Sequence, residues 1–262
     1  LFESKLHPPT AHAALISRAA LVERLDTSDV PITVVAAPPG YGKTTLLAEW
    51  SRRDPSRFAW LSIDRYDNDL GRLMAYTAAA LDRVDAIEAE LLRPGGRQSV
   101  ATVASRLAST MSGMKEPVVL VLDHVEALEN DECLDTIAEL ALHLPARSRL
   151  ALGTRAEPPL PMARLRAGGE VVEVGVDDLA MTGSEGRALL DAAGVQLTDA
   201  EIDALLDRTE GWPVGLYLAA LALKAGGSRE DAGVPFTGDD RLMADYLRTE
   251  LLERLSGADV SF

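Results

Sequence analysis

The chain has 262 residues, of which 47% are hydrophobic and 26% are charged, a composition typical of a globular protein with a substantial core. Its longest apolar runs, 117–122 and 216–223, are far too short to cross a bilayer, and no signal peptide is visible. A single cysteine, Cys133, excludes an intramolecular disulfide, and we expect a buried thiol in a protein of the reducing cytoplasm.

The net charge of −15 is unevenly distributed along the chain. Residues 171–262 carry 18 acidic and 7 basic groups, so this part has a net charge of −11 and residues 1–170 have −4. An acidic surface repels phosphate backbones. We therefore expect this segment to make no direct contact with nucleic acid, and we expect no membrane contact.

The chain begins with an irregular arm. Residues 1–14 show little periodicity, whereas 15–25 has the apolar spacing of a helix and contains Arg18. A β-branched run at 32–37 then predicts a strand, and 44–53 predicts a helix.

The segment between this strand and this helix reads Ala-Ala-Pro-Pro-Gly-Tyr-Gly-Lys-Thr-Thr from residue 36 to 45. Strand, glycine-containing loop, Lys-Thr and helix, in this order, predict a phosphate-binding P-loop, with Ala37 in place of the usual first glycine. The two glycines permit positive φ and close backbone approach. Lys43 supplies charge to the β- and γ-phosphates, and Thr44 supplies a hydroxyl to Mg²⁺. The nucleotide-binding residues expected from the loop are Pro39, Gly40, Tyr41, Gly42, Lys43, Thr44 and Thr45.

A second apolar strand is predicted at 58–63, and the carboxylate-rich loop 64–69 follows it. In open α/β sheets ligands bind at the carboxyl ends of strands, so this loop is a candidate ligand-binding edge. The ligand spacing of a Ca²⁺ loop is absent, and an Asx-capped turn is an equally good interpretation. Helices are predicted at 70–84 and 100–111.

An apolar strand at 117–123 carries Asp123 at its tip, the pattern of a Walker B strand whose carboxylate holds Mg²⁺. Many ATPases have a second acidic residue next, which orients the attacking water, but this chain has His124. Glu126 is a candidate substitute if its loop turns it inward. We interpret His124 as a polar loop residue and not as a metal ligand.

Two further strands are predicted at 149–154 and 170–174, with a short helix at 165–167 between them. Arg155 follows the first of these strands, where an arginine can sense the γ-phosphate as charge develops on it. An ordinary surface arginine is the alternative. The pattern predicts an α/β nucleotide-binding domain over residues 1–175.

No strand is apparent after residue 175. Thr198-Asp-Ala-Glu201 fits a capping box, and Gly-Trp-Pro at 211–213 interrupts the helical pattern. We expect residues 176–262 to form a helical subdomain. Its predicted helices are 182–193, 199–209, 214–225 and 242–255.

Five blocks of the sequence carry a resemblance to a known family. They are residues 36–50, 60–64 with 67–69, 119–123, 154–155 with 158–159, and 209–221. Together they resemble the ATPase module of STAND proteins, in the MalT-type large LuxR-family transcriptional regulators. The resemblance extends from about Lys5 to Leu255, and the Gly-Trp-Pro block is its most specific part.

The resemblance implies a five-stranded parallel sheet of AAA+-like order, followed by a helical subdomain. It assigns Arg18 and Pro213 to the base and ribose of the nucleotide and makes Arg155 the sensor arginine. Members of the family switch between an ADP-bound resting form and a self-associating ATP-bound form, and hydrolysis resets them. The resemblance also implies that winged-helix, sensor and DNA-binding domains lie outside this chain.

Two features depart from the family pattern. The family commonly has Asp-Asp at the tip of the Walker B strand, whereas this chain has Asp123-His124, which puts the hydrolysis rate in doubt. A second arginine is often seen near the N-terminal helix, and this chain has Ala20 there.

We therefore expect an ATP/ADP-binding, Mg²⁺-dependent and weakly hydrolysing switch module of a signal-responsive transcriptional regulator. Its expected catalytic residues are Lys43, Asp123, Arg155 and, as the candidate substitute, Glu126. The alternative is a non-hydrolysing nucleotide-binding scaffold, which could be attached to another effector such as a kinase. A small-molecule P-loop kinase is disfavoured because no lid or acceptor-binding signature is evident.

Overall fold

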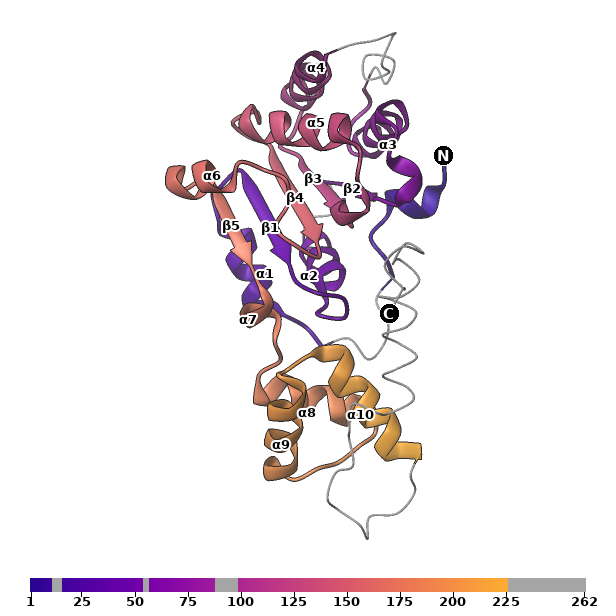
Figure 1. The fold of residues 1–262 in the computed structure, drawn as a ribbon, viewed down its shortest axis with the longest axis vertical. Helices are drawn as coiled ribbons and strands as arrows, with labels where there is room; N and C mark the ends of the chain where they lie inside the picture. The colour runs from indigo at the N-terminus through magenta and orange to yellow at the C-terminus, as the bar shows by residue number, and fades with distance from the viewer. Residues whose placement is uncertain (11–15, 54–56, 88–98, 226–262) are drawn as a thin grey trace, which may run out of the picture. The chain divides into compact units, whose positions relative to one another are not determined.

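The structure of the chain is a computed structural model that describes residues 1–10, 16–53, 57–87 and 99–225 (Figure 1). The chain divides into two compact units. The α/β unit comprises Leu1–Ala11, Ser17–Pro38 and Lys43–Asp178. The helical unit comprises His12–Ile16, Pro39–Gly42 and Leu179–Phe262.

The α/β unit contains a five-stranded parallel sheet with the strand order β2-β3-β4-β1-β5. Its strands are β1 (Ile32–Ala36), β2 (Phe58–Ser62), β3 (Val119–Asp123), β4 (Arg149–Thr154) and β5 (Val171–Val174). All five predicted strands are present, and β1, β3 and β4 are buried along almost their whole length because a parallel sheet is covered on both faces. The predicted α/β fold class is confirmed.

Helices cover both faces of this sheet (Figure 1). The helices of this unit are α1 (Ala19–Asp26), α2 (Lys43–Ser51), α3 (Leu70–Asp82), α4 (Val100–Ser112), α5 (Asp131–Leu142), α6 (Met162–Gly168) and α7 (Val176–Leu179). Short 3₁₀ turns are η1 (Glu3–Leu6), η3 (Arg65–Asp67) and η5 (Val125–Ala127). Alternate strand residues such as Leu120 and Leu122 form one buried cluster with the apolar side chains of α3, α4 and α5. None of the described helices is long and apolar enough to cross a membrane.

The structure differs from the predicted helices in three places, the third being the short helix α7, which is absent from the predicted elements. The first helix begins at Ala19, so Arg18 precedes it as the N-cap residue instead of lying inside it. The second difference is α5, which is absent from the predicted elements. Asn130 caps this helix by accepting a hydrogen bond from the Glu132 amide.

Cys133 lies on α5 and is fully buried, as predicted. Burial raises the pKa of its thiol to about 11, and nearby carboxylates, of which Asp69 contributes most, act in the same direction. The thiol is therefore protonated and shielded, in agreement with a packing role.

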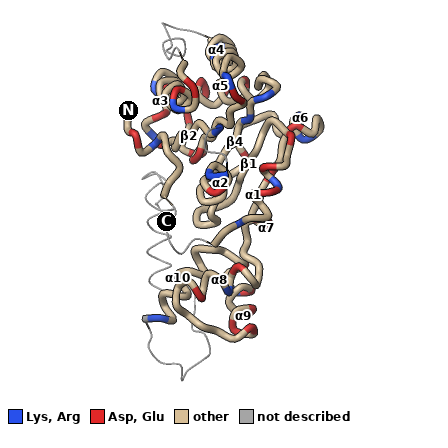
Figure 2. Tube along the Cα trace, turned by 180° about the vertical axis from the view of Figure 1, so that it is seen from behind, with Lys and Arg blue, Asp and Glu red and all other residues tan. Residues whose placement is uncertain are grey.

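The helical unit contains α8 (Gly183–Ala192), α9 (Asp199–Thr209) and α10 (Pro213–Ala225). Both α8 and α9 begin with a capping box, and the box at Thr198 and Glu201 confirms the predicted one. Acidic residues outnumber basic ones along α9 (Figure 2). The helix predicted at 242–255 lies outside the described residues.

Candidate functional site

The P-loop joins β1 to α2, and both of its glycines have left-handed backbone conformations. Gly40 and Gly42 have φ angles of 82° and 83°, in the left-handed region that residues with a Cβ rarely adopt. Lys43 begins α2 and is buried, and its Nζ donates a hydrogen bond of 3.1 Å to the Pro38 carbonyl oxygen. The ammonium and the amides at the helix N-terminus together give the loop a positive character.

Asp123 ends β3 and is fully buried. Thr44 Oγ1 donates a hydrogen bond of 2.7 Å to its Oδ2. The carboxyl ends of parallel strands lie at one edge of a sheet, and the P-loop leaves β1 at the same edge. The predicted Walker B aspartate and the P-loop threonine are therefore in contact.

Space for the Asp123 carboxylate comes from Gly153 on β4, which pairs with Asp123 in the parallel register. A Cβ on Gly153 would lie 2.3 Å from Asp123 Oδ1 and 3.1 Å from Leu47 Cδ1. A side chain at this position would therefore displace the carboxylate. The apolar sequence pattern of β4 does not reveal this role of Gly153. Only the pairing register of β3 and β4 shows that Gly153 lies beside Asp123.

The oxygens around Asp123 suit a magnesium ion. Asp123 Oδ1 is buried without a hydrogen-bond partner, and the Thr44 hydroxyl lies beside the same carboxylate. Mg²⁺ is commonly held by one or two carboxylates together with waters and substrate phosphates. The described residues contain no group of three or more His, Cys, Asp and Glu side chains that could hold a metal ion. These oxygens thus fit a cation whose remaining ligands are water and nucleotide.

The turn after β3 brings Glu126 inward. His124 has a φ of 63°, in the left-handed region, and η5 follows it. His124 Nδ1 lies 3.4 Å from Glu126 Oε1, and its Nε2 lies 3.5 Å from Asp123 Oδ2. The hydrogen bond with Glu126 raises the pKa of His124 against the opposing effect of burial, and the charge of Asp123 adds to the increase. The imidazole therefore lies between two carboxylates.

Arg155 follows β4, and its Nε donates a hydrogen bond of 2.9 Å to Glu126 Oε1. The side chains of Arg155 and Glu126 are 18% and 14% exposed, so the pair is largely shielded from water. Burial raises the pKa of Glu126, but the His124 hydrogen bond and the charges of His124 and Arg155 outweigh it and hold that pKa below its ordinary value. Arg155 is thus partly buried and paired with Glu126, and its role at the γ-phosphate stays a prediction.

The carboxylate-rich loop 64–69 is a set of caps and ion pairs. Asp64 caps η3 and Asp69 caps α3, each by accepting a backbone hydrogen bond. Asp67 is fully buried and forms ion pairs with Lys5 of the N-terminal arm and with Arg72. Of the two interpretations of this loop, the capped turn matches the structure.

Asn68 connects this loop to the η5 turn. Its Nδ2 donates to the Ala127 carbonyl oxygen over 2.7 Å, and its Oδ1 accepts from the amides of Glu129 and Asn130 over 2.6 and 3.0 Å. These bonds satisfy the backbone groups that follow Glu126 and so hold the turn. Sequence reasoning missed Asn68, because only the pairing of β2 with β3 brings the two loops together.

Residues Pro39–Gly42 cluster with the helical unit and contact its Gly-Trp-Pro block. Trp212 Nε1 donates to the Pro39 carbonyl oxygen over 3.0 Å, and the Val214 amide donates to that of Gly40 over 3.3 Å. A Cβ on Gly40 would lie 2.6 Å from Trp212 Nε1. Glycine at position 40 is therefore required by its φ angle and also by the indole that packs against it.

Arg18 and Pro213, which the resemblance assigns to base and ribose, belong to different units. Arg18 is buried, and its backbone amide donates to Glu49 Oε2 over 2.9 Å. Pro213 is the first residue of α10, a position that does not need the backbone N–H that proline lacks. Nucleotide contacts by these two residues, and by residues 39–45 of the loop, stay predictions.

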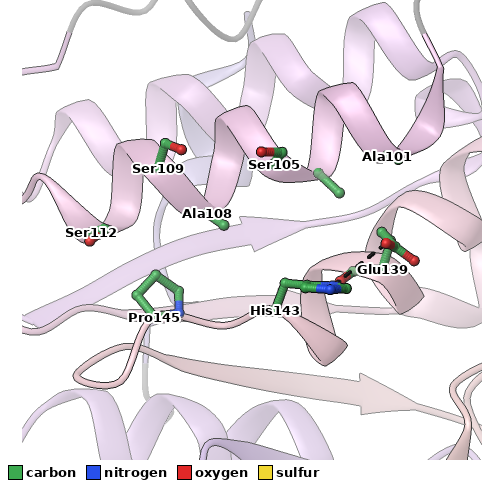
Figure 3. A pocket seen from close by; sticks show the side chains of 9 residues that line it. Ala101, Ser105, Ala108, Ser109, Ser112, Glu139, His143 and Pro145 are labelled. Atoms are coloured by element: carbon green, nitrogen blue, oxygen red, sulfur yellow. Dashed lines mark hydrogen bonds and ion pairs between the residues drawn. The ribbon is translucent and has the colours of Figure 1, made fainter.

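A separate groove of about 470 Å³ lies between α4 and the end of α5 (Figure 3). Small alanine and serine side chains of α4 line one wall, and Glu139 and His143 line the other. His143 Nδ1 lies 3.0 Å from the Glu139 carbonyl oxygen. The groove includes no residue of the P-loop or of the turn after β3, so it is distinct from the predicted nucleotide site.

No family model matches the chain. In an alignment of 270 positions it is 30% identical to the HTH-type transcriptional regulator MalT of Serratia proteamaculans, covering 100% of this chain and 30% of that protein. It is 28% identical over 263 positions to MalT of Yersinia enterocolitica, covering 97% of this chain and 29% of that protein. The chain therefore spans less than a third of the length of these relatives.

Two solved structures are similar in fold. The Walker-type ATPase PABY2304 of Pyrococcus abyssi has a TM-score of 0.56 at 14% identity, covering 85% of this chain and 71% of that one. Drosophila ORC bound to DNA has a TM-score of 0.51 at 12% identity, covering 86% of this chain and 60% of that one. At these identities the similarity shows the fold alone.

The family resemblance seen in the sequence is confirmed by the two MalT relatives: the chain is homologous over its full length to part of the MalT-type transcriptional regulators.

Proposed function

We propose that this chain is a nucleotide-binding regulatory module that takes ATP and ADP together with Mg²⁺. The observation that carries the proposal is the hydrogen bond between Thr44 and the buried Asp123. Thr44 directly follows Lys43, the first residue of α2. A carboxylate with an unpartnered oxygen, a hydroxyl, an ammonium and a helix N-terminus together suit a polyphosphate with its cation. The proposed nucleotide-binding residues are Arg18, Pro39, Gly40, Tyr41, Gly42, Lys43, Thr44, Thr45 and Pro213.

The proposed roles follow the chemistry of each side chain. Lys43 exchanges the Pro38 carbonyl oxygen for the β- and γ-phosphates. Thr44 and Asp123 hold Mg²⁺, which when bound neutralises charge on the phosphate oxygens and so favours phosphoryl transfer. We assign Arg155 to the γ-phosphate, where its charge stabilises the transition state.

We further propose that hydrolysis is slow, with Glu126 in the role of the missing second carboxylate. Its Oε2 is buried without a hydrogen-bond partner and can accept a hydrogen bond from the attacking water. Its Oε1 is shared between Arg155 and His124. Because Glu126 comes from a turn and has these competing partners, we expect weak turnover.

The names of the relatives supply the biological setting. They are HTH-type transcriptional regulators, so we propose that the chain is the switch module of a signal-responsive regulator. In this proposal the ADP form is resting and the ATP form self-associates. DNA contact would belong to another part of such a regulator, because residues 171–262 carry a net charge of −11 and repel phosphates.

The direct test is the nucleotide that the purified chain carries and binds. We expect denaturation and chromatography to release ADP, and calorimetric titration of nucleotide-free protein to show binding of ADP and ATP. EDTA should weaken ATP binding, because the Thr44 and Asp123 oxygens then have no cation to share with the phosphates. A preparation that carries no nucleotide and gives no heat with either at millimolar concentration would contradict the proposal.

His124 favours a second candidate function, a nucleotide-binding scaffold without turnover. Single-turnover hydrolysis separates the two functions: we expect a rate above that of the Lys43→Ala variant, and an equal rate would support the scaffold. Replacing His124 by aspartate should raise the rate about tenfold, because aspartate tolerates the left-handed conformation and restores the acidic pair. His7→Asp, an exposed change on the N-terminal arm, is the control and should leave the rate unchanged.

A further inference from the structure

We propose that the ion pair between Glu126 and Arg155 is a latch through which the module distinguishes ATP from ADP. The proposal rests on the proposed function above and names the regulation of the same site. Glu126 holds Arg155 while ADP or no nucleotide is bound. The γ-phosphate of ATP competes for Arg155, and the exchange frees the Glu126 carboxylate for the attacking water.

The contacts of Glu126 converge on one of its two oxygens. Arg155 Nε donates to Oε1 over 2.9 Å, and His124 Nδ1 lies 3.4 Å from the same atom. Oε2 is buried and has no hydrogen-bond partner. A buried acceptor without a partner is unfavourable. The carboxylate is therefore incompletely satisfied in the latched arrangement and loses less on release than a fully bonded one.

The charges make the exchange selective for ATP. A γ-phosphate carries more negative charge than a carboxylate and offers more oxygens, so it competes well for a guanidinium. The competition is weakly screened, because the side chains of Arg155 and Glu126 are only 18% and 14% exposed. ADP lacks the competing group. The Glu126 charge should therefore lower the affinity for ATP and leave the affinity for ADP nearly unchanged.

The backbone around Glu126 is held in place, so the exchange requires only side-chain rotation. Asn68 bonds to the Ala127 carbonyl and to the amides of Glu129 and Asn130, directly after Glu126. Arg155 follows the last residue of β4, which pairs with β1 and β3. The two side chains thus meet from fixed supports, as a two-state contact requires.

The test is the affinity of the whole chain for ADP and for a non-hydrolysable ATP analogue, both with Mg²⁺, measured by calorimetry. In Glu126→Gln the ratio of analogue affinity to ADP affinity should rise roughly tenfold, a coupling typical of competing ligands. In an Arg155→Met background the same change should leave the ratio unaltered, because no arginine remains to be released.

Two further variants sharpen the test. Glu129→Gln removes the same charge three positions along, at an exposed residue, and should leave the ratio unchanged. Glu126→Asp keeps the charge but shortens the side chain, so its carboxylate falls short of Arg155 and the ratio should again rise. This variant decides the matter if Glu126→Gln does not fold.

If the folded Glu126 variants have the wild-type ratio of analogue affinity to ADP affinity, the latch is overturned. The proposed function still stands in that case, provided that the wild-type protein binds both nucleotides. An equal rise in Glu129→Gln or in the Arg155→Met background would also overturn the latch, since the effect would then be one of general charge. Wild-type protein that binds neither nucleotide would overturn the proposed function itself.

Discussion

The Lys43→Ala variant should lose at least about 100-fold in affinity for both ADP and ATP, or roughly 3 kcal/mol of binding free energy. The Lys43 side chain is buried at the start of α2, and its Nζ already donates to the Pro38 carbonyl oxygen. The ammonium is thus largely desolvated before a phosphate arrives, and little further desolvation opposes binding. Alanine keeps the loop amides and the helix but removes this charge.

Calorimetric titration with each nucleotide measures the loss, and circular dichroism checks that the variant is folded. Lys115→Ala is the matched control, because the Lys115 side chain is 83% exposed and pairs with Asp85 away from the P-loop. It should bind both nucleotides as the wild type does. If a folded Lys43→Ala protein kept its affinity, the P-loop would not be the nucleotide site.

Replacing Gly153 by alanine should lower single-turnover hydrolysis about 100-fold, the typical cost of misplacing a catalytic group by about 1 Å. The new Cβ would lie 2.3 Å from Asp123 Oδ1, and neither β4 nor β3 can move aside because both are interior strands of the sheet. The carboxylate must therefore rotate away, which breaks its hydrogen bond with Thr44. The increase in ATP affinity on addition of Mg²⁺ should be lost with it.

The hydrolysis rate and the ratio of ATP affinities with Mg²⁺ and with EDTA are the measurements. Gly175→Ala is the control, since a Cβ on Gly175 meets no atom within 4 Å. This control should behave as the wild type. Normal Mg²⁺ dependence in a folded Gly153→Ala protein would show that Asp123 does not hold the cation.

The sheet could be predicted from the sequence because its central strands β3, β4 and β1 are buried on both faces. Such strands read as apolar runs, as 119–123 does, and a glycine loop with Lys-Thr after the first run indicates the P-loop. The prediction missed α5, although Asn130 and the acidic first turn are ordinary signals for the start of a helix. These signals lie between two stronger motifs, the Walker B strand and the strand that precedes Arg155. Arg18 was predicted inside a helix because apolar periodicity does not mark where the backbone first becomes helical.

The rest of the site depends on spatial neighbours that no local pattern specifies. Gly153 matters because β4 lies beside β3 in a register that aligns it with Asp123. Asn68 matters because β2 lies on the other side of β3. From the sequence, Glu126 could be proposed only on the condition that its loop turns the side chain inward. The left-handed backbone of His124 provides this turn. These are tertiary facts, and a single sequence contains them only implicitly.

The pairing of β1 has a consequence for how the chain is made. Ile32 pairs with Leu150 on one side and with Val171 on the other, so the strand that leads into the P-loop has no sheet neighbour until residue 150 exists. At translation rates of about 5–20 residues per second, β1 waits roughly 6–24 s for its first partner. During that time an apolar strand edge is exposed on the nascent chain, a condition that invites aggregation and chaperone binding. The P-loop residues are therefore synthesised early, but β1 can pair with its neighbouring strands and fix the position of the loop only late in synthesis.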